Sequence, residues 1–318
     1  MIRNLNPIFL PSLIYFKREE ITNISYNFLS PLDNDRYNLS IKNILKNIMP
    51  LKNKSSYFLD INKFMIKSVI NIKKNNNDYI WIINEFHIRI NEFNNMIIPL
   101  EKLFALAASN GAYKIFITVE EEEKNKYTKF LYDLDFILHD EKLSLSKKII
   151  TSKNKNKINF DNLRNINSSD QFNIYQMLSK KSNDNFSEEI PINFNQWLKD
   201  QKIKEDISKL MIFEENSEIK SFIEITNKDN MDYVNFIFFT NNKKKIVEII
   251  NATITKLKIS NCYTIISSKN ETLLNCLINE GFQVNKKYQT LYKNIKLPIK
   301  LEKKYYKKGI KIGVPNWQ

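Results

Sequence analysis

Hydrophobic and polar residues follow a pattern along the chain that occurs twice. Each occurrence opens with a short apolar segment around an arginine, Ile2-Arg3-Asn4-Leu5-Asn6 and later Leu163-Arg164-Asn165-Ile166-Asn167. Apolar residues at helical spacing follow both segments, which predicts a strand and then an amphipathic helix. These apolar residues are Leu10, Leu13, Ile14 and Phe16 in the first half and Phe172, Ile174, Tyr175 and Leu178 in the second. A repeat of about half the chain indicates two similar domains.

The middle of each repeat is rich in β-branched and aromatic residues. The predicted strands are residues 57–59, 63–72 and 79–90 in the first repeat and 210–214, 219–226 and 233–239 in the second. Short polar connections such as Asn227-Lys228-Asp229-Asn230 separate them. Connections of this length between β-rich segments are typical of antiparallel hairpins, so we expect a mostly antiparallel sheet in each repeat.

The ends of the two repeats also match. The predicted order is helix, strand and helix, at residues 102–109, 113–119 and 127–135 in the first repeat and 247–259, 263–266 and 271–281 in the second. A phenylalanine then leads into a closing strand, with a leucine nine residues later and a lysine two residues after the leucine. The residues that share this spacing are Phe136, Leu145 and Lys147 in the first repeat and Phe282, Leu291 and Lys293 in the second.

A polar segment separates the two repeats. Thr151-Ser152-Lys153-Asn154-Lys155-Asn156-Lys157 is basic and has no apolar residue, as is typical of an inter-domain crossing. We therefore expect an N-terminal domain at 1–152, a C-terminal domain at 158–297 and a basic tail at 298–318.

The order of elements, the opening Ile2-Arg3 and Leu163-Arg164 pairs and one stretch near the end resemble the GCN5-related N-acetyltransferase (GNAT) family. That stretch runs from Asn270 through an apolar helix to Gly281-Phe282, and the first repeat has a shorter version with Asp135 where the family prefers glycine. The resemblance implies an α+β (mixed α/β) fold with two GNAT-like domains, packed as an intramolecular pseudo-dimer. Each domain is then a mostly antiparallel central sheet flanked by helices.

The resemblance also implies acetyl-CoA as cofactor, whose pyrophosphate the family binds on a glycine-containing loop at a helix N-terminus. The first repeat has Glu92 and no glycine at this place, and the second has Asn242-Lys243-Lys244-Lys245, also without glycine. A helix N-terminus with lysines can still hold a phosphate. The predicted cofactor residues are therefore Asn242, Lys243, Lys244 and Lys245, together with Asn270. A solvated helix end in a lysine-rich chain is the alternative interpretation.

Catalysis in the family needs a carboxylate on the central strands and often a tyrosine on the last helix. Glu85 and Glu224 are the nearest carboxylates, although an outward-facing strand position is the favoured interpretation of each. The tyrosine place holds Leu131 and Leu277, and Tyr132 lies one residue out of register, which rotates it by about 100° on a helix. Glu85, Glu224 and Tyr132 are the catalytic candidates.

Composition limits the remaining hypotheses. The net charge is +14, but only five of the 49 basic residues are arginine, and we favour compositional drift over nucleic-acid binding as the cause. Cys262 and Cys276 suit buried reduced thiols, not a metal cluster or a disulfide framework. No apolar segment is long enough to span a membrane, so we expect a cytoplasmic protein.

Three hypotheses for function stay open. The first is an acyl-CoA-dependent N-acyltransferase with an unknown amine acceptor, in which the second domain holds the cofactor and the first supports it. The second is a non-catalytic scaffold or binding protein that partners another protein. The third is an RNA- or ribosome-associated factor that uses the lysines and tyrosines of the tail.

Overall fold

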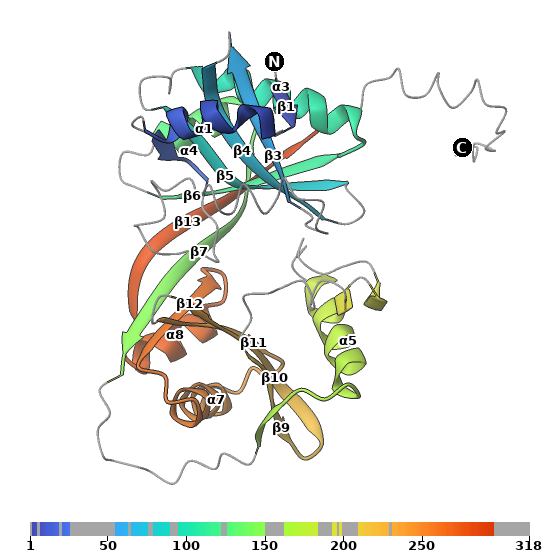
Figure 1. The fold of residues 1–318 in the computed structure, drawn as a ribbon. Helices are drawn as coiled ribbons and strands as arrows, with labels where there is room; N and C mark the ends of the chain where they lie inside the picture. Colours follow the sequence, from blue (N-terminus) through green and yellow to red (C-terminus); the bar gives the residue numbers. More distant parts are fainter. Residues whose placement is uncertain are drawn as a thin grey trace, which may run out of the picture. The chain divides into compact units, whose positions relative to one another are not determined.

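The computed structural model divides the chain into two compact units (Figure 1). It describes residues 2–4, 7–18, 21–25, 55–62, 65–75, 79–89, 95–121, 126–149, 162–183, 193–195, 197–198, 209–228 and 231–295. Unit 1 contains the described residues of Met1–Val119, Asn125–Leu138 and Leu291–Gln318, and unit 2 contains those of Glu120–Lys124 and His139–Thr290. The predicted linker at 151–157, the predicted basic tail and Glu92 lie outside the described residues.

Unit 1 is built on a mostly antiparallel sheet with the order β1-β3-β4-β5-β6-β13, and β2 pairs with β5. Its strands are β1 (Ile2–Asn4), β2 (Ile21–Asn23), β3 (Ser55–Asn62), β4 (Met65–Asn75), β5 (Ile80–Arg89), β6 (Lys114–Glu120) and the end of β13 (Gln283–Asn294). Its helical segments are η1 (Pro7–Phe9), α1 (Leu10–Lys17), α3 (Ile97–Ser109) and α4 (Lys126–Asp133). Only β5 and β6 run parallel among the strands up to β6, because α3 connects them as a crossover.

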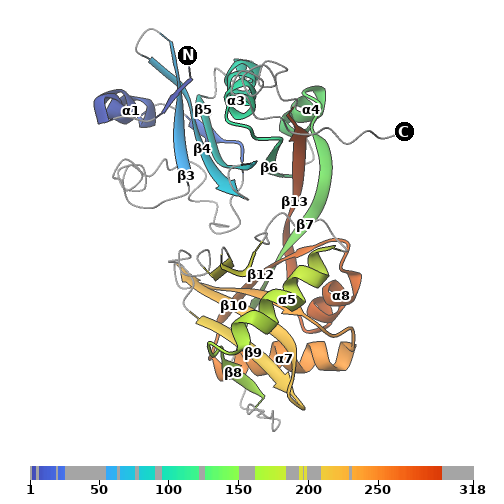
Figure 2. The same cartoon turned by 90° about the vertical axis from the view of Figure 1, so that its right-hand side faces the viewer.

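Helices cover both faces of the unit 1 sheet (Figure 2). Trp81 of β5 packs in a core with Leu100 of α3 and Leu131 of α4. On the opposite face, Phe16 of α1 packs in a core with Val69 of β4. Successive strand side chains point to opposite faces, so one strand can serve both cores.

Unit 2 repeats this plan with the strand order β13-β7-β12-β11-β10-β9-β8. Its strands are β7 (Ile137–Lys148), β8 (Leu163–Asn165), β9 (Lys209–Glu215), β10 (Glu218–Lys228), β11 (Met231–Phe238), β12 (Asn261–Ser267) and the first part of β13. Its helices are α5 (Asp170–Asn183), α7 (Lys243–Lys256) and α8 (Glu271–Asn279). Again β11 and β12 are parallel and α7 connects them.

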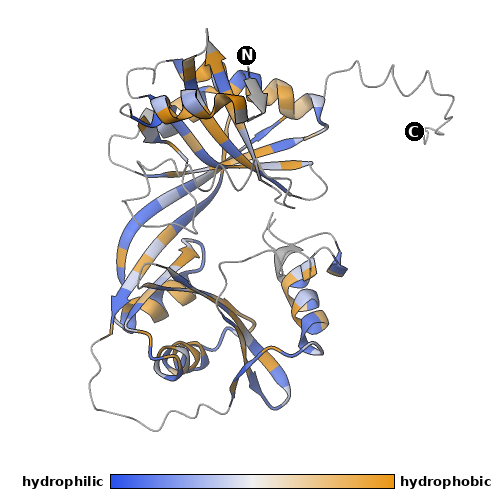
Figure 3. Ribbon diagram, viewed as in Figure 1, coloured by the Kyte–Doolittle hydropathy of each residue, from blue (hydrophilic) through white to orange (hydrophobic). Residues whose placement is uncertain are grey.

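The two faces of the unit 2 sheet are covered differently. Ile249 of α7 and Leu277 of α8 pack in the larger core. On the other face, Ile174 of α5 packs with Trp197 and Phe222, and Tyr175 lies beside this group. Hydrophobic residues accordingly mark one side of α7 and α8 and parts of the strands beneath them (Figure 3).

Left-handed residues end four of the described helices, including Lys258 after α7 with a φ of 53°. Gly111 follows α3 with a φ of 82°, and Gly281 follows α8 with a φ of 84°. Asp135 takes the matching place after α4 with a φ of 61°. A residue other than glycine pays about 1–2 kcal/mol in this conformation. The first repeat therefore keeps the helix stop that the sequence predicted, at a small cost in stability.

The predicted fold class is confirmed, since both units are mixed α+β structures with mostly antiparallel sheets. The predicted strands of both hairpin regions correspond to β3–β5 and β9–β11. The helical stripes were wrong at two positions, because Ile14 and Phe172 are exposed. Their helices bury Leu13 and Phe16 in one case and Ile174 and Leu178 in the other, so a narrower stripe faces each sheet.

Candidate active site

The parallel strands of unit 2 separate soon after they begin. β11 pairs with β12 only at Asp232–Cys262 and Tyr233–Tyr263, although β11 continues to Phe238. Residues 234–238 still pair with β10 on their other side. Within the described part of the chain, no other strand takes the place of β12 beside them. Among the described residues, positions 234–237 of β11 therefore have no strand on the side that β12 has left, and we call this stretch the open edge.

The same strands of unit 1 separate as well, but the gap is filled. β5 pairs with β6 only through Ile80–Ile83. Beyond this point β2 pairs with β5, from Ile21–Arg89 to Asn23–His87. β4 already pairs with the other side of these residues, so β2 occupies the side that β6 has left.

Further hydrogen bonds extend this closure to Phe86. Its N–H donates to the side-chain oxygen of Asn23 over 2.8 Å, and its carbonyl accepts from the N–H of Ile24 over 3.0 Å. Ile21 and Ile24 are both buried. The backbone groups of β5 that correspond to the open edge of β11 are therefore hydrogen-bonded to β2 and to the residue after it.

Glu85, a predicted catalytic residue, is half-buried in a polar cluster of unit 1. The Tyr57 hydroxyl donates to its Oε2 over 3.4 Å, and His87 Nε2 lies 3.2 Å from the same oxygen. The side chains of Glu85 and His87 are 25% and 2% exposed. Burial, and then the charge of Glu85, raise the pKa of Tyr57 far above its ordinary value, so Tyr57 stays protonated and donates.

Glu224, the second predicted catalytic carboxylate, lies on the open side of unit 2. It is on β10 directly opposite Asn235 of β11, whose side-chain nitrogen donates to Glu224 Oε2 over 2.8 Å. Asn235 is exposed and Glu224 is half-buried. Phe222 and Ile237, two residues away on these strands, belong to the group packed around α5, so Glu224 and Asn235 lie on that face.

Two tyrosines lie on neighbouring strands at the point where β11 and β12 separate. The rings of Tyr233 and Tyr263 pack edge to face with centroids 5.2 Å apart. Tyr233 lies two residues before Asn235 and so points to the same face. The sequence analysis did not single out Asn235, Tyr233 or Tyr263. A polar residue within the otherwise apolar run Val234-Asn235-Phe236 was the available signal.

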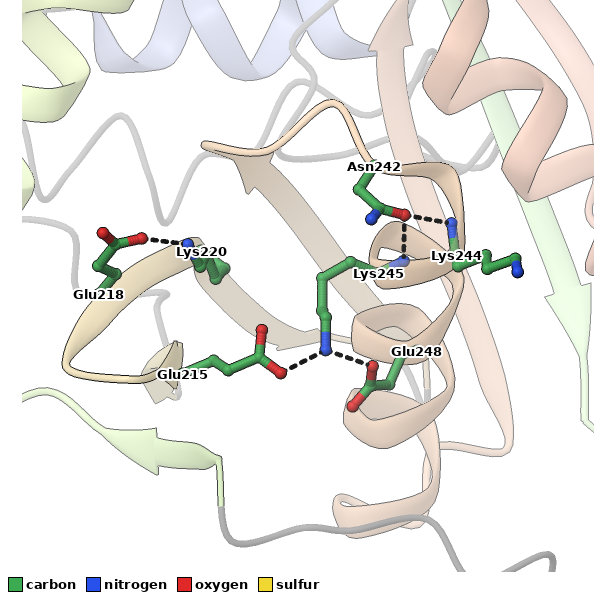
Figure 4. Close-up of polar contacts among 7 residues, drawn as sticks. All are labelled: Glu215, Glu218, Lys220, Asn242, Lys244, Lys245 and Glu248. Atoms are coloured by element: carbon green, nitrogen blue, oxygen red, sulfur yellow. Dashed lines mark hydrogen bonds and ion pairs between the residues drawn. The ribbon is translucent and has the colours of Figure 1, made fainter.

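The predicted cofactor residues Asn242 and Lys245 cap and brace the start of α7 (Figure 4). The side-chain oxygen of Asn242 accepts from the N–H groups of Lys244 and Lys245 over 3.0 and 3.3 Å. Lys245 Nζ lies 2.6 Å from Glu215 Oε1 and 2.7 Å from Glu248 Oε2. The hydrogen bond to Glu215, followed by that to Glu248, raises the pKa of Lys245.

The other predicted residues fall into two groups. Lys243 and Lys244 are exposed at the first turn of α7, where a phosphate is favoured by the helix dipole. Asn270 caps α8, and its side chain accepts from the N–H of Leu273 over 3.2 Å. Tyr132 is 42% exposed on α4, whereas its neighbour Leu131 is fully buried. Lys243, Lys244 and Glu224 therefore all belong to unit 2, whereas Tyr132 lies on the surface of unit 1.

The two cysteines are buried within the fold. Cys262 and Cys276 are unpaired and buried, and burial raises the pKa of Cys262 to about 12 and also raises that of Cys276. In the described part of the chain, no group of three or more His, Cys, Asp or Glu residues is arranged to hold a metal ion. None of the described helices has the length and apolar character needed to cross a membrane.

Comparison with known proteins gives a match in structure only. No family model matches the chain, and neither does any curated protein sequence. Among solved structures, a GCN5-related N-acetyltransferase from Sphaerobacter thermophilus has a TM-score of 0.59 and 8% identity, covering 93% of this chain and 96% of that one. A tandem GNAT protein from the clavulanic acid biosynthesis pathway has a TM-score of 0.59 and 6% identity, covering 93% and 98%.

A third similar structure is a putative acetyltransferase from Pyrococcus horikoshii, with a TM-score of 0.56, 9% identity and coverage of 93% and 90%. Identities this low carry information about the fold and not about the reaction. The matches extend over nearly the whole chain and include a tandem protein. The chain has a tandem GCN5-related N-acetyltransferase fold.

Proposed function

We propose that the protein is an acyl-CoA-dependent N-acyltransferase whose working site lies in unit 2, and that unit 1 supports it. The open edge of β11 beyond Tyr233 carries this proposal. An extended ligand with amide groups, such as the pantetheine arm of CoA, can hydrogen-bond to a strand edge that no described strand covers. In unit 1 the equivalent edge is occupied by β2.

The residues around this edge fit such a cofactor in part. Lys243 and Lys244 are exposed at the first turn of α7, where the helix dipole and two ammonium groups attract phosphates. The N–H groups of Lys244 and Lys245 are already bonded to Asn242. A phosphate at this helix would therefore compete with the Asn242 side chain for the same donors.

Glu224 is the group that would take a proton from an amine acceptor. It lies on the α5 face on β10, one strand away from the open edge of β11, and its hydrogen bond with Asn235 orients one carboxylate oxygen. When bound, acyl-CoA supplies the activated acyl group. Tyr233 and Tyr263 provide an aromatic surface at the point where the strands part. A positively charged amine is attracted both to this surface and to the Glu224 carboxylate.

A non-catalytic binding protein is the second candidate. The capped start of α7 and the buried Leu277, which takes the place of the family's tyrosine, favour it. In this case the fold is kept for assembly or for binding another protein. Nucleic-acid binding through the tail stays a prediction, because residues 298–318 lie outside the described residues.

A thermal-shift titration with acetyl-CoA separates the two candidates. A ligand that binds only the folded state raises the free energy of unfolding by about 2.7 kcal/mol at a ligand concentration of 100 times Kd. Free CoA and ATP control for general attraction of polyphosphates to a basic protein. We expect a CoA-selective shift that weakens in the double variant Lys243→Ala/Lys244→Ala and persists in Lys209→Ala, an exposed lysine at the start of β9. Equal shifts with ATP, or no shift, would favour the binding protein.

A further inference from the structure

The closing strand of the first repeat belongs to unit 2. β7 pairs with β12 along the whole run from Lys142–Ser267 to Lys148–Asn261. Leu143 and Leu145 are buried in the unit 2 core. Beyond the paired run, the N–H of Ile149 donates to the carbonyl of Ser260 over 2.8 Å. The first repeat therefore supplies both sheet partners and core side chains to the second.

The loop that follows β12 also holds the beginning of β7. The N–H of Ser268 donates to the carbonyl of Glu141 over 2.7 Å. The Ser267 hydroxyl donates to Asp140 Oδ1 over 2.7 Å. Lys269 Nζ donates to the carbonyl of His139 over 3.2 Å. Four consecutive positions of the first repeat's chain, from 139 onward, are thus fixed by residues of the second repeat or enter its paired strand.

The closing strand of the second repeat makes the reverse contribution. The end of β13, from Leu291, belongs to unit 1, and Leu291 and Ile295 are buried in its core. The N–H of Ile295 donates to the carbonyl of Tyr113 over 2.8 Å. The ring of Tyr292 lies 5.7 Å from that of Phe116, and Lys114 Nζ lies 4.7 Å above it.

The two lysines that share their spacing in sequence occupy reciprocal places. Lys293 of the second repeat lies over the Phe104 ring of the first at 5.4 Å, and its Nζ lies 3.2 Å from Asp135. Lys147 of the first repeat lies over the Phe282 ring of the second at 5.7 Å. Each lysine therefore meets residues of the opposite repeat near the end of its last helix, where a positive charge is favoured.

We propose that the two repeats exchange their closing strands and for this reason fold as a mutually dependent pair. Neither repeat alone carries the leucines that complete its core, because Leu145 belongs to the unit 2 core and Leu291 to the unit 1 core. β7 and β13 are largely hydrophilic, so these few buried leucines fix where each strand belongs (Figure 3). Each unit is thus completed by the closing strand of the other repeat, which carries a buried leucine and, two residues later, a lysine.

Hydrogen exchange on the full chain, resolved by peptide, tests the proposal through Leu145→Ala and Leu291→Ala. Both leucines are fully buried, and removing such a side chain opens its surroundings. We expect Leu291→Ala to speed exchange in β6 and α4 of the first repeat by about thirtyfold or more. Leu145→Ala should do the same in β12 and α8 of the second repeat. Lys148→Ala and Asn294→Ala, at exposed positions on the same strands, are the matched controls.

Faster exchange throughout both units in either variant also supports mutual dependence. Faster exchange confined to a leucine's own repeat would overturn the proposal. If the leucine variants do not fold, Lys148→Cys/Asn261→Cys decides, because directly paired antiparallel residues lie within reach of a disulfide. If the closing strands are exchanged, both introduced thiols are consumed and the disulfide forms within one molecule. Free thiols, or bonds only between molecules, would contradict it.

Discussion

The two units hold the same pair of diverging parallel strands in different surroundings. In unit 1, β2 pairs with β5 at the place where β6 departs, and the half-buried Glu85 lies in a polar cluster with Tyr57 and His87. In unit 2, no described strand replaces β12 beside residues 234–237, and the half-buried Glu224 pairs with the exposed Asn235 on the α5 face. In the described residues, one sheet plan thus gives an edge that β2 covers and an edge without a described partner strand.

The difference between the two edges is the reason that we assign the supporting role to unit 1 and the working site to unit 2. In unit 1 the segment after α1 covers the strand edge, since β2 pairs with β5 and both Ile21 and Ile24 are buried. β2 thereby occupies backbone groups of β5 that a ligand could otherwise use. In unit 2, Glu224 and Tyr233 lie on the α5 face, and the exposed start of α7 follows β11 in the chain.

The largest effect that we expect is on turnover. If Glu224 accepts the proton from the amine, Glu224→Gln should lower the rate of CoA thiol release by about 100-fold or more, with acetyl-CoA and a panel of primary amines. Glu85→Gln in unit 1 is the matched control and should leave the rate unchanged, because its surroundings are closed. A loss of rate in Glu85→Gln but not in Glu224→Gln would reverse the comparison.

A smaller effect concerns the stability of the α5 face. Arg164 binds Asp170 through two hydrogen bonds of 2.6 and 2.9 Å and also binds Glu214 over 2.7 Å. Asp170 is buried, so Arg164→Met should lower the free energy of unfolding by about 2–3 kcal/mol in a urea titration. Arg164→Lys keeps the positive charge but loses the paired donors of the guanidinium group, so its free energy of unfolding should lie between those of the wild type and Arg164→Met. An unchanged midpoint in Arg164→Met would show that this network does not anchor α5.

The same network predicts a dependence on pH. The hydrogen bonds from Arg164 lower the pKa of Asp170 below its ordinary value. A depressed carboxyl pKa contributes stability that is fully present above the unfolded pKa of about 3.9 and is lost as the pH falls through the folded value. Urea midpoints should therefore decrease below about pH 4 in the wild type, and less so in Asp170→Asn. Equal acid sensitivity in the two proteins would exclude Asp170 as the cause.

The smallest effect tests the start of α7. Removing a side-chain cap costs about 1 kcal/mol, so Asn242→Ala should be less stable by that amount. It also releases the N–H groups of Lys244 and Lys245, so affinity for acetyl-CoA should stay equal or increase. Asn242→Asp keeps a cap and adds a negative charge, and should bind acetyl-CoA more weakly. Reduced affinity in Asn242→Ala would indicate that the asparagine itself holds the ligand.

Local patterns made much of the fold predictable. Alternating and helical spacings gave β3–β5, β9–β11, α3 and α7 within a few residues, and Gly111 and Gly281 marked helix ends correctly. β2 was not predicted, because three residues are too few to show an alternating pattern. Nor was the exchange of closing strands, since Leu145 and Leu291 have the same spacing and either strand satisfies either core.

The candidate site was less accessible from sequence. Glu224 and the lysines of α7 were singled out, but their partners lie on other strands. Glu215, which binds Lys245, is 30 residues away in the chain, and Asn235 is 11 residues from Glu224. Pairing between strands is set by register and packing in space, so sequence spacing does not reveal which polar residue meets which.

Hydrogen exchange on the full chain with and without acetyl-CoA would show which unit binds the cofactor. We expect acetyl-CoA to slow exchange in β11 beyond Tyr233 and in the first turn of α7, with β5 and the start of α3 unchanged. Slower exchange in β5 and α3, with unit 2 unaffected, would contradict this expectation.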